Sequence, residues 1–166
     1  ISMIYIYFLN KEEQKKKDIK ILVVDDDPVT RTLLEKKLQK AEYEIELAEN
    51  GVAAVRMIAD QFYDVVLTDL MMAPMDGMKL LRRIRARYPR IQVIMFTSFS
   101  SVSNAVKAMR LGAFSFFTKG NPAEELLTEV RKVARMARDE PADADASAVH
   151  DREREIGVGD RKITLR

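Results

Sequence analysis

Residues 21–30 read ILVVDDDPVT, with four apolar residues followed by three consecutive carboxylates and a proline. The apolar run is typical of a short buried strand, and Pro28 behind Asp27 is typical of a helix that begins after an N-cap residue. Neighbouring carboxylates repel one another, and in a partly buried site the repulsion raises their pKa values unless a cation or hydrogen-bond donors offset it. The stretch therefore predicts a strand-to-helix turn whose acidic cluster needs a partner.

The composition limits the chemistry that the chain can perform. Its 166 residues, 47% of them hydrophobic, suit one ordinary domain with extensions. The 28 basic and 26 acidic residues leave a formal charge of +2, which favours neither nucleic acid nor an anionic membrane as a partner. There is no cysteine and only one histidine, His150, so thiolate metal sites are excluded and histidine triads are hard to build. Carboxylates, hydroxyls and lysines remain.

The apolar opening, residues 1–10, is too short to cross a bilayer, which takes about 20 helical residues. Its charged stretch KEEQKKKD follows the apolar run, whereas a secretory signal carries its positive charges first. We expect an added strand or a mobile extension over residues 1–18, with a self-association segment as the alternative, and no membrane partner. Residues 140–166, rich in Ala, Asp and Pro at their start, are expected to form a linker and a charged tail.

Between these ends, residues 19–139 alternate short apolar runs with segments of helical period, which predicts an α/β domain with a parallel sheet. The five expected strands are residues 19–24, 43–48, 64–68, 91–96 and 115–118. The five expected helices begin at Pro28, after residues 50–51, near Met78, at residue 101 and after residues 121–122, the last ending near Asp139. A flavodoxin-like (βα)5 doubly wound sheet with strand order 2-1-3-4-5 is the expected architecture.

Ligands of such sheets bind beyond the carboxyl ends of the strands, where the strand order reverses. Strand one ends in Asp25 and Asp26, strand three in Asp69, strand four in Thr97 and strand five in Lys119. Three carboxylates without imidazole or thiolate suit a hard divalent cation such as Mg²⁺. A hydroxyl and an ammonium group are donors that the oxygens of a transferred phosphoryl group need, which leaves one aspartate as the nucleophile.

Four ordered motifs carry a resemblance to a known family. They are VVDD at residues 23–26, LTDL at 67–70 with MDG at 75–77, FTS at 96–98 and FFTK at 116–119. The chain resembles the receiver domain of bacterial two-component response regulators, the CheY-like fold, over about residues 20–139. The resemblance implies that Asp69 accepts a phosphoryl group from a sensor histidine kinase or a phosphotransfer protein. It also implies that Asp26, Asp69 and the backbone carbonyl of Met71 hold Mg²⁺, with Asp25 acting through water.

The same resemblance implies a switch. Thr97 and Phe116 correspond to the family's switch pair, in which the hydroxyl follows the phosphoryl group and the ring turns inward. The fourth helix, fifth strand and fifth helix of the domain then present a changed surface, which could also form a homodimer. The family's role is cytoplasmic signalling, with self-catalysed phosphotransfer and slow autodephosphorylation only, and nucleic acid is reached only through a separate output domain.

The sequence departs from the family pattern at two loops. The proline expected four residues after the acceptor is Ala73, and the proline comes at Pro74, so the loop is expected to be re-aimed. Gly120 follows Lys119 where the family has proline, which favours a trans peptide bond there. Met71 and an apolar Phe99 flank the expected pocket and cannot orient an attacking water, which predicts slow hydrolysis.

Two alternatives fit parts of the same pattern. DDDPV at residues 25–29 also satisfies the motif of haloacid-dehalogenase-like phosphatases, with Asp25 as nucleophile and Asp27 as acid. That interpretation leaves Asp69 without a role and lacks the expected acidic metal motif after the lysine. A receiver-like domain that only binds partners is the second alternative, and the presence of Asp69, Thr97 and Lys119 argues against it.

Overall fold

Five parallel strands form one sheet in the order β2-β1-β3-β4-β5. The computed structural model describes residues 2–17 and 19–139, so the expectation for residues 140–166 lies outside the described residues. The strands are β1 Lys20–Val24, β2 Glu44–Ala48, β3 Val65–Thr68, β4 Gln92–Thr97 and β5 Ser115–Thr118. Each lies within one or two residues of its predicted position, and the predicted fold class and strand order are confirmed.

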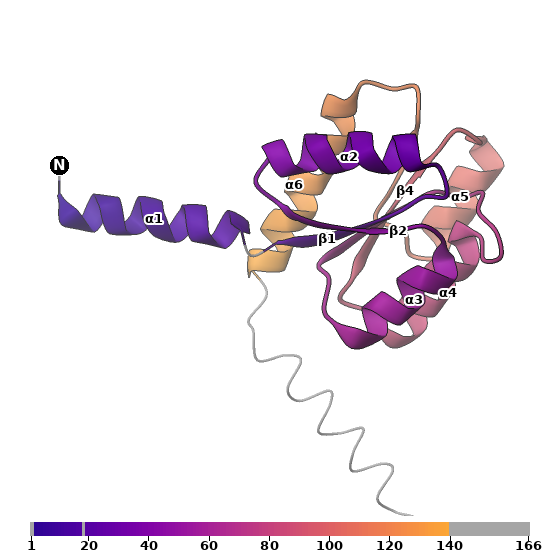
Figure 1. Cartoon of the computed structure of the whole chain (residues 1–166), viewed down its shortest axis with the longest axis horizontal. Coiled ribbons are helices and arrows are strands. Elements are labelled where there is room, and N and C mark those ends of the chain that lie inside the picture. Colours follow the sequence, from indigo (N-terminus) through magenta and orange to yellow (C-terminus); the bar gives the residue numbers. More distant parts are fainter. Residues whose placement is uncertain (1, 18, 140–166) are drawn as a thin grey trace, which may run out of the picture.

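Helices cover both faces of the sheet (Figure 1). On one face lie α2 Pro28–Lys40 and α6 Ala123–Asp139, and on the other lie α3 Gly51–Asp60, α4 Gly77–Arg87 and α5 Val102–Arg110. Side chains alternate between the two faces of a strand, so β1 sends Leu22 and Val24 to one core and Ile21 and Val23 to the other. The sheet is therefore buried on both faces, as its continuous apolar strands predicted.

The two cores contain the apolar faces of the helices on each side of the sheet. In α4, Leu80, Leu81 and Ile84 are buried against the sheet. On the opposite face, the buried residues of α6 are Leu126, Leu127, Val130, Val133 and Ala134. Because both layers are packed around the same strands, the carboxyl ends of those strands are held at fixed positions relative to one another.

Local capping residues start the helices where the sequence predicted. The Asp27 carboxylate accepts hydrogen bonds from the N–H groups of Val29 and Thr30, at 3.2 and 3.1 Å, at the start of α2. Asn50, Asp76 and Ser101 cap α3, α4 and α5 in the same way. Gly112, just beyond α5, has a φ of 94°, a conformation that L side chains rarely adopt. The helix starts and the end of α5 depend on neighbouring residues alone, so the sequence was enough to predict them.

The segment before the sheet corrects one expectation. This segment was expected to be an added strand or a mobile extension, and the strand is wrong because the residues form the helix α1, Met3–Lys17. The chain leads into β1, which has a neighbour on each side, so an added strand would have had to reach the sheet edge at β2 or β5. The apolar side chains of residues 3–9 are 46–84% exposed, and α1 extends away from the sheet (Figure 1). Self-association through this segment stays a prediction.

In the part of the chain that the structure describes, no helix combines the length and the apolar content that a bilayer crossing requires.

Candidate functional site

The residues predicted for the site gather at the carboxyl edge of the sheet. Val24 and Thr68 are paired in register, so Asp25 and Asp69, which follow them, lie side by side. The Asp69 N–H group donates to the Val24 carbonyl at 2.9 Å. Thr97 ends the next strand, and Lys119 follows the strand after that. The sheet topology thus brings Asp25 close to Lys119, although the two residues are 94 positions apart in the sequence.

Three carboxylates form the acidic part of this site. One oxygen from each of Asp25, Asp26 and Asp69 lies within 4.8 Å of the others. Asp25 and Asp69 are buried, at 1% and 6% exposure, whereas Asp26 is exposed. Hard oxygen ligands at this spacing, with one reachable from solvent, fit Mg²⁺, which binds few protein carboxylates and keeps several waters. The donor set therefore suits the metal that the sequence predicted.

Lys119 bridges the two buried carboxylates. Its Nζ lies 2.6 Å from Asp25 Oδ2 and 3.0 Å from Asp69 Oδ2. Burial raises the pKa of Asp25 above 3.8, although the hydrogen bond from Lys119 opposes this rise. Burial also acts to lower the pKa of Lys119, but its hydrogen bonds to Asp25 and Asp69 prevail and raise that pKa above 10.5. The sequence interpretation assigned charge compensation to the metal, and the structure shows that the lysine also supplies it.

Backbone donors hold the Asp69 carboxylate. Its Oδ1 accepts from the N–H groups of Leu70 and Met71, at 2.7 and 3.4 Å, while its Oδ2 faces Lys119. The Thr68 hydroxyl donates to the Asp69 carbonyl at 2.9 Å. Both carboxylate oxygens are therefore oriented by the protein, as a positioned nucleophile requires.

The loop between β3 and α4 folds closely over Asp69. A Cβ atom built on Gly77 would lie 2.1 Å from the Asp69 carbonyl oxygen, so only glycine fits at this position. The Gly77 N–H group donates to the Leu70 carbonyl at 2.9 Å and closes the loop. Among the described residues, the one cis peptide bond joins Ala73 and Pro74, so the bond after Lys119 is trans, as Gly120 suggested.

Thr97 and the flanking apolar residues are also in place. Thr97 is fully buried, and its Oγ1 accepts a hydrogen bond from the Phe99 N–H group at 3.1 Å. The side chains of Met71 and Phe99 are 51% and 59% exposed on loops at this edge. Phe116 on β5 is half-buried against the core beneath α3, α4 and α5. Its predicted switch role and the ligand role of the Met71 carbonyl stay predictions.

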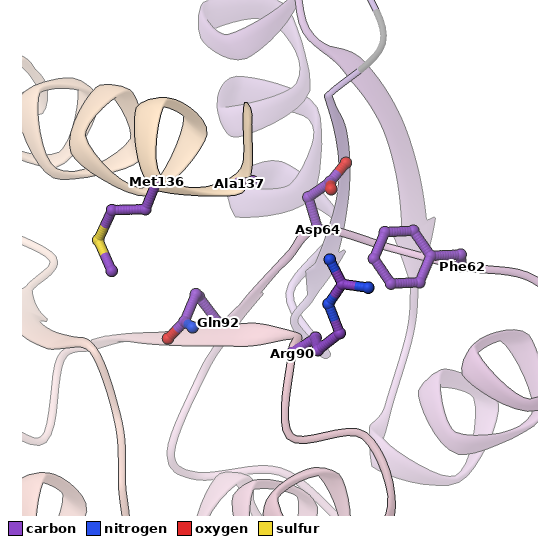
Figure 2. A pocket seen from close by; sticks show the side chains of 6 residues that line it. All are labelled: Phe62, Asp64, Arg90, Gln92, Met136 and Ala137. Atoms are coloured by element: carbon purple, nitrogen blue, oxygen red, sulfur yellow. The ribbon is translucent and has the colours of Figure 1, made fainter. Parts of the chain in front are cut away.

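A small cleft lies elsewhere on the molecule. Figure 2 shows the residues that line it, which are Phe62, Asp64, Arg90, Gln92, Met136 and Ala137. Gln92 is the first residue of β4, so this cleft lies near the amino ends of the strands, away from Asp25, Asp26 and Asp69. Its volume of about 30 Å³ holds only a few water molecules.

A parallel sheet of this order, with an acidic cluster, a threonine and a lysine at its carboxyl edge, defines a receiver domain. The chain belongs to the response regulator receiver domain family, whose model matches residues 21–131. It is therefore a signalling domain of two-component systems, and receiver domains bind Mg²⁺ at an acidic aspartate cluster. This membership removes the phosphatase alternative. Asp27, its expected acid, is instead the exposed cap of α2.

Individual relatives agree with this assignment. Response regulator MprA of Mycobacterium ulcerans is 35% identical over 155 residues, covering 89% of this chain and 67% of that protein. Transcriptional regulatory protein ZraR of Escherichia coli is 37% identical over 132 residues, covering 80% of this chain and 30% of that protein.

Solved structures show the same fold. The BeF3-activated receiver domain of Klebsiella pneumoniae RstA has a TM-score of 0.67 at 32% identity, covering 70% of this chain and 98% of that one. The response regulator TrrA of Thermotoga maritima, solved in complex with Mg²⁺-BeF, has a TM-score of 0.64 at 32% identity, covering 69% of this chain and 98% of that one.

Substituting Asp26 separates metal binding from stability. The Asp26→Asn protein is expected to melt at a higher temperature than the unchanged chain in EDTA, because one of three mutually repelling charges is gone, and to bind Mg²⁺ more weakly. Thermal melts with and without Mg²⁺ measure both effects. Asp60→Asn, an exposed substitution at the far end of α3, is the control for metal binding. An Asp26→Asn protein that is less stable in EDTA and binds Mg²⁺ normally would contradict the prediction.

Proposed function

We propose that this chain accepts a phosphoryl group on Asp69 from a sensor histidine kinase or a phosphotransfer protein, in a reaction that requires Mg²⁺. The observation that carries the proposal is the Asp69 carboxylate itself. It is 6% exposed, oriented by two backbone N–H groups, bonded to Lys119 and flanked by the carboxylates of Asp25 and Asp26. A structural aspartate would need no such acidic neighbours.

The residues divide the work of the transfer. An Asp69 oxygen attacks the phosphorus and the bond from phosphorus to the donor's imidazole nitrogen breaks. The electron pair of that bond stays on the nitrogen, and the imidazole, protonated on its other nitrogen, leaves as a neutral ring. Asp26, Asp69 and the Met71 carbonyl would hold Mg²⁺ directly, with Asp25 acting through water, and the bound ion would neutralise charge on the phosphoryl oxygens. Lys119 offers a second positive charge beside the acceptor, at 3.0 Å from Asp69 Oδ2.

The same proposal includes a change of surface over α5, β5 and α6. Thr97 and Phe116 are the switch pair: the buried hydroxyl lies at the end of β4, and the half-buried ring lies on the neighbouring strand β5. Along α5, Val102, Val106 and Met109 form an exposed apolar stripe, at 82%, 42% and 48% exposure. This stripe supports a partner or homodimer contact on that face.

The output belongs to the whole protein. The chain spans about two thirds of MprA and less than one third of ZraR. Any contact with nucleic acid is proposed to occur through an output domain in the full protein, and not through the receiver. A cytoplasmic location follows from the same signalling role and stays a prediction.

Phosphorylation of the unchanged chain tests the proposal. Incubation with phosphoramidate and Mg²⁺ is expected to add one phosphoryl group, which intact-mass spectrometry detects, and EDTA is expected to prevent it. Peptide mapping then locates the label. A label on Asp25 in place of Asp69 would restore the phosphatase interpretation, and no label under any condition would refute the phosphoacceptor role.

The two apolar flanking residues predict a long-lived phosphoryl group. Met71 and Phe99 border the site and cannot orient a water molecule by hydrogen bonding. The double substitution Met71→Asn with Phe99→Glu is therefore expected to speed loss of the label by at least about tenfold, since a positioned proton acceptor contributes a large factor to hydrolysis. Decay of the labelled mass in Mg²⁺ gives the rate. Unchanged decay would show that these side chains do not limit hydrolysis.

A further inference from the structure

An arginine outside the predicted site contacts the turn that carries the acidic cluster. Arg31 lies in the second turn of α2 and is half-buried. Its Nη1 donates a hydrogen bond to the backbone carbonyl of Asp25 at 2.5 Å. The sequence gives no signal for this contact, because the partner of Arg31 is a backbone atom and leaves no residue pattern.

The contact lies on one side of Asp26, the exposed carboxylate of the cluster. The peptide group before Asp26 is held through its carbonyl by Arg31. The peptide group after Asp26 is held through the Asp27 N–H group, which donates to Asp25 Oδ1 at 2.9 Å. Both peptide groups that set the direction of the Asp26 side chain are therefore fixed, although that side chain itself is open to solvent.

Arg31 is also tied to the helix that follows the turn. Its N–H group donates to the Asp27 carbonyl at 3.1 Å, within the first turn of α2 that Asp27 caps. The guanidinium group thus spans from the helix back to the end of β1 and fixes the turn between them. Its acceptor is a neutral carbonyl, whereas Lys119 binds the carboxylate oxygens of Asp25 and Asp69 directly.

We propose that Arg31 is a positioning residue for the metal site, holding the turn between β1 and α2 so that Asp26 presents its carboxylate to Mg²⁺. The inference rests on the proposed function and deepens it by adding a residue that acts through Asp26. Groups that orient metal ligands without touching the metal typically contribute a factor of about 10 to 100 in affinity.

Calorimetric titration of the full chain with Mg²⁺ tests the role. Arg31→Met keeps the length of the aliphatic stem and removes the donors, and it is expected to weaken Mg²⁺ binding by about tenfold. Arg31→Lys keeps one charged donor and is expected to bind with intermediate affinity. Arg82→Met, an exposed arginine on α4 at the other face of the sheet, is the matched control and should bind like the unchanged chain.

A second measurement distinguishes positioning of Asp26 from a purely stabilising contact between α2 and the turn before it. Thermal melts in EDTA report the stability of each variant without metal. An Arg31→Met protein that is destabilised in EDTA but binds Mg²⁺ within twofold of the unchanged chain would overturn the proposal. A twofold change in affinity corresponds to about 0.4 kcal/mol of binding free energy. If Arg31→Met does not fold, unchanged Mg²⁺ affinity in Arg31→Lys overturns it equally.

The result also separates this inference from the proposed function. If the unchanged chain binds no Mg²⁺, the metal site itself fails. If the unchanged chain binds Mg²⁺ and Arg31→Met binds it equally well, only the role of Arg31 fails.

Discussion

Phosphoramidate with Mg²⁺ is expected to add no phosphoryl group to the Asp69→Asn protein, while Asp27→Asn is expected to label like the unchanged chain. Asn has nearly the shape of Asp but its amide oxygen is a far weaker nucleophile, so the loss at Asp69 should be complete. Asp27 is exposed and caps α2, and Asn caps helices as well as Asp does, so the fold should persist. Intact-mass spectrometry compares the three proteins.

Asp69 belongs to the acidic cluster and Asp27 lies beside it in the chain, but the two carboxylates have different contacts. Asp69 bonds to Lys119, whereas Asp27 bonds to the backbone and hydroxyl of Thr30. A label that survives Asp69→Asn and disappears with Asp27→Asn would contradict the assignment of the acceptor.

Lys119→Met is expected to lower the free energy of unfolding at neutral pH by about 3 kcal/mol, since removing one partner of a buried ion pair leaves an uncompensated charge. Here the loss leaves the two carboxylates of Asp25 and Asp69, at 1% and 6% exposure, without their shared ammonium group. Urea unfolding at neutral pH measures the change. The control Lys107→Met removes an exposed lysine from α5 and should alter the free energy by less than about 0.5 kcal/mol.

The pH dependence of the same variant gives a further check. Burial raises the pKa of Asp25 above its ordinary 3.8, and without Lys119 that rise should increase. A carboxyl group whose folded pKa is raised adds stability below its unfolded pKa, and this stability is lost as pH rises through the folded value. The difference in free energy of unfolding between Lys119→Met and the unchanged chain should therefore become smaller as the pH falls from neutral toward 3.8.

At alkaline pH, stability is expected to fall in the unchanged chain and not in the variant. The pKa of Lys119 is raised above 10.5, so in the unchanged chain its contribution is present below that pH and is lost as the pH rises through the folded value. Lys119→Met should lack this alkaline loss.

Mg²⁺ should also restore part of the stability of the variant, because the ion compensates the same carboxylates. A variant as stable as the unchanged chain at neutral pH would refute the structural role of the ion pair.

Much of the fold follows from local features of the sequence. The alternation of apolar strands with amphipathic helices, the capping residues Asp27 and Asn50, and the end of α5 at Gly112 depend on near neighbours in the chain. Such signals act within a few residues, so they identify elements and their ends without any knowledge of packing. The handedness of βα crossovers then leaves few possible sheet topologies. In such a sheet the carboxyl ends of the strands meet at one edge, which predicts that Asp25, Asp69, Thr97 and Lys119 are neighbours.

What the tertiary structure alone decided concerns which group contacts which. Composition and spacing placed Lys119 at the site but did not show that its ammonium group bridges Asp25 and Asp69. Arg31 gave no signal, because its hydrogen bond goes to a backbone carbonyl that every residue possesses. The sequence before β1 likewise left a strand and a mobile extension open, and the structure shows the helix α1 there. Local propensity therefore determined the elements and the residues at their ends, while the distances among those residues, and hence the compensation of their charges, were set by packing between segments far apart in the chain.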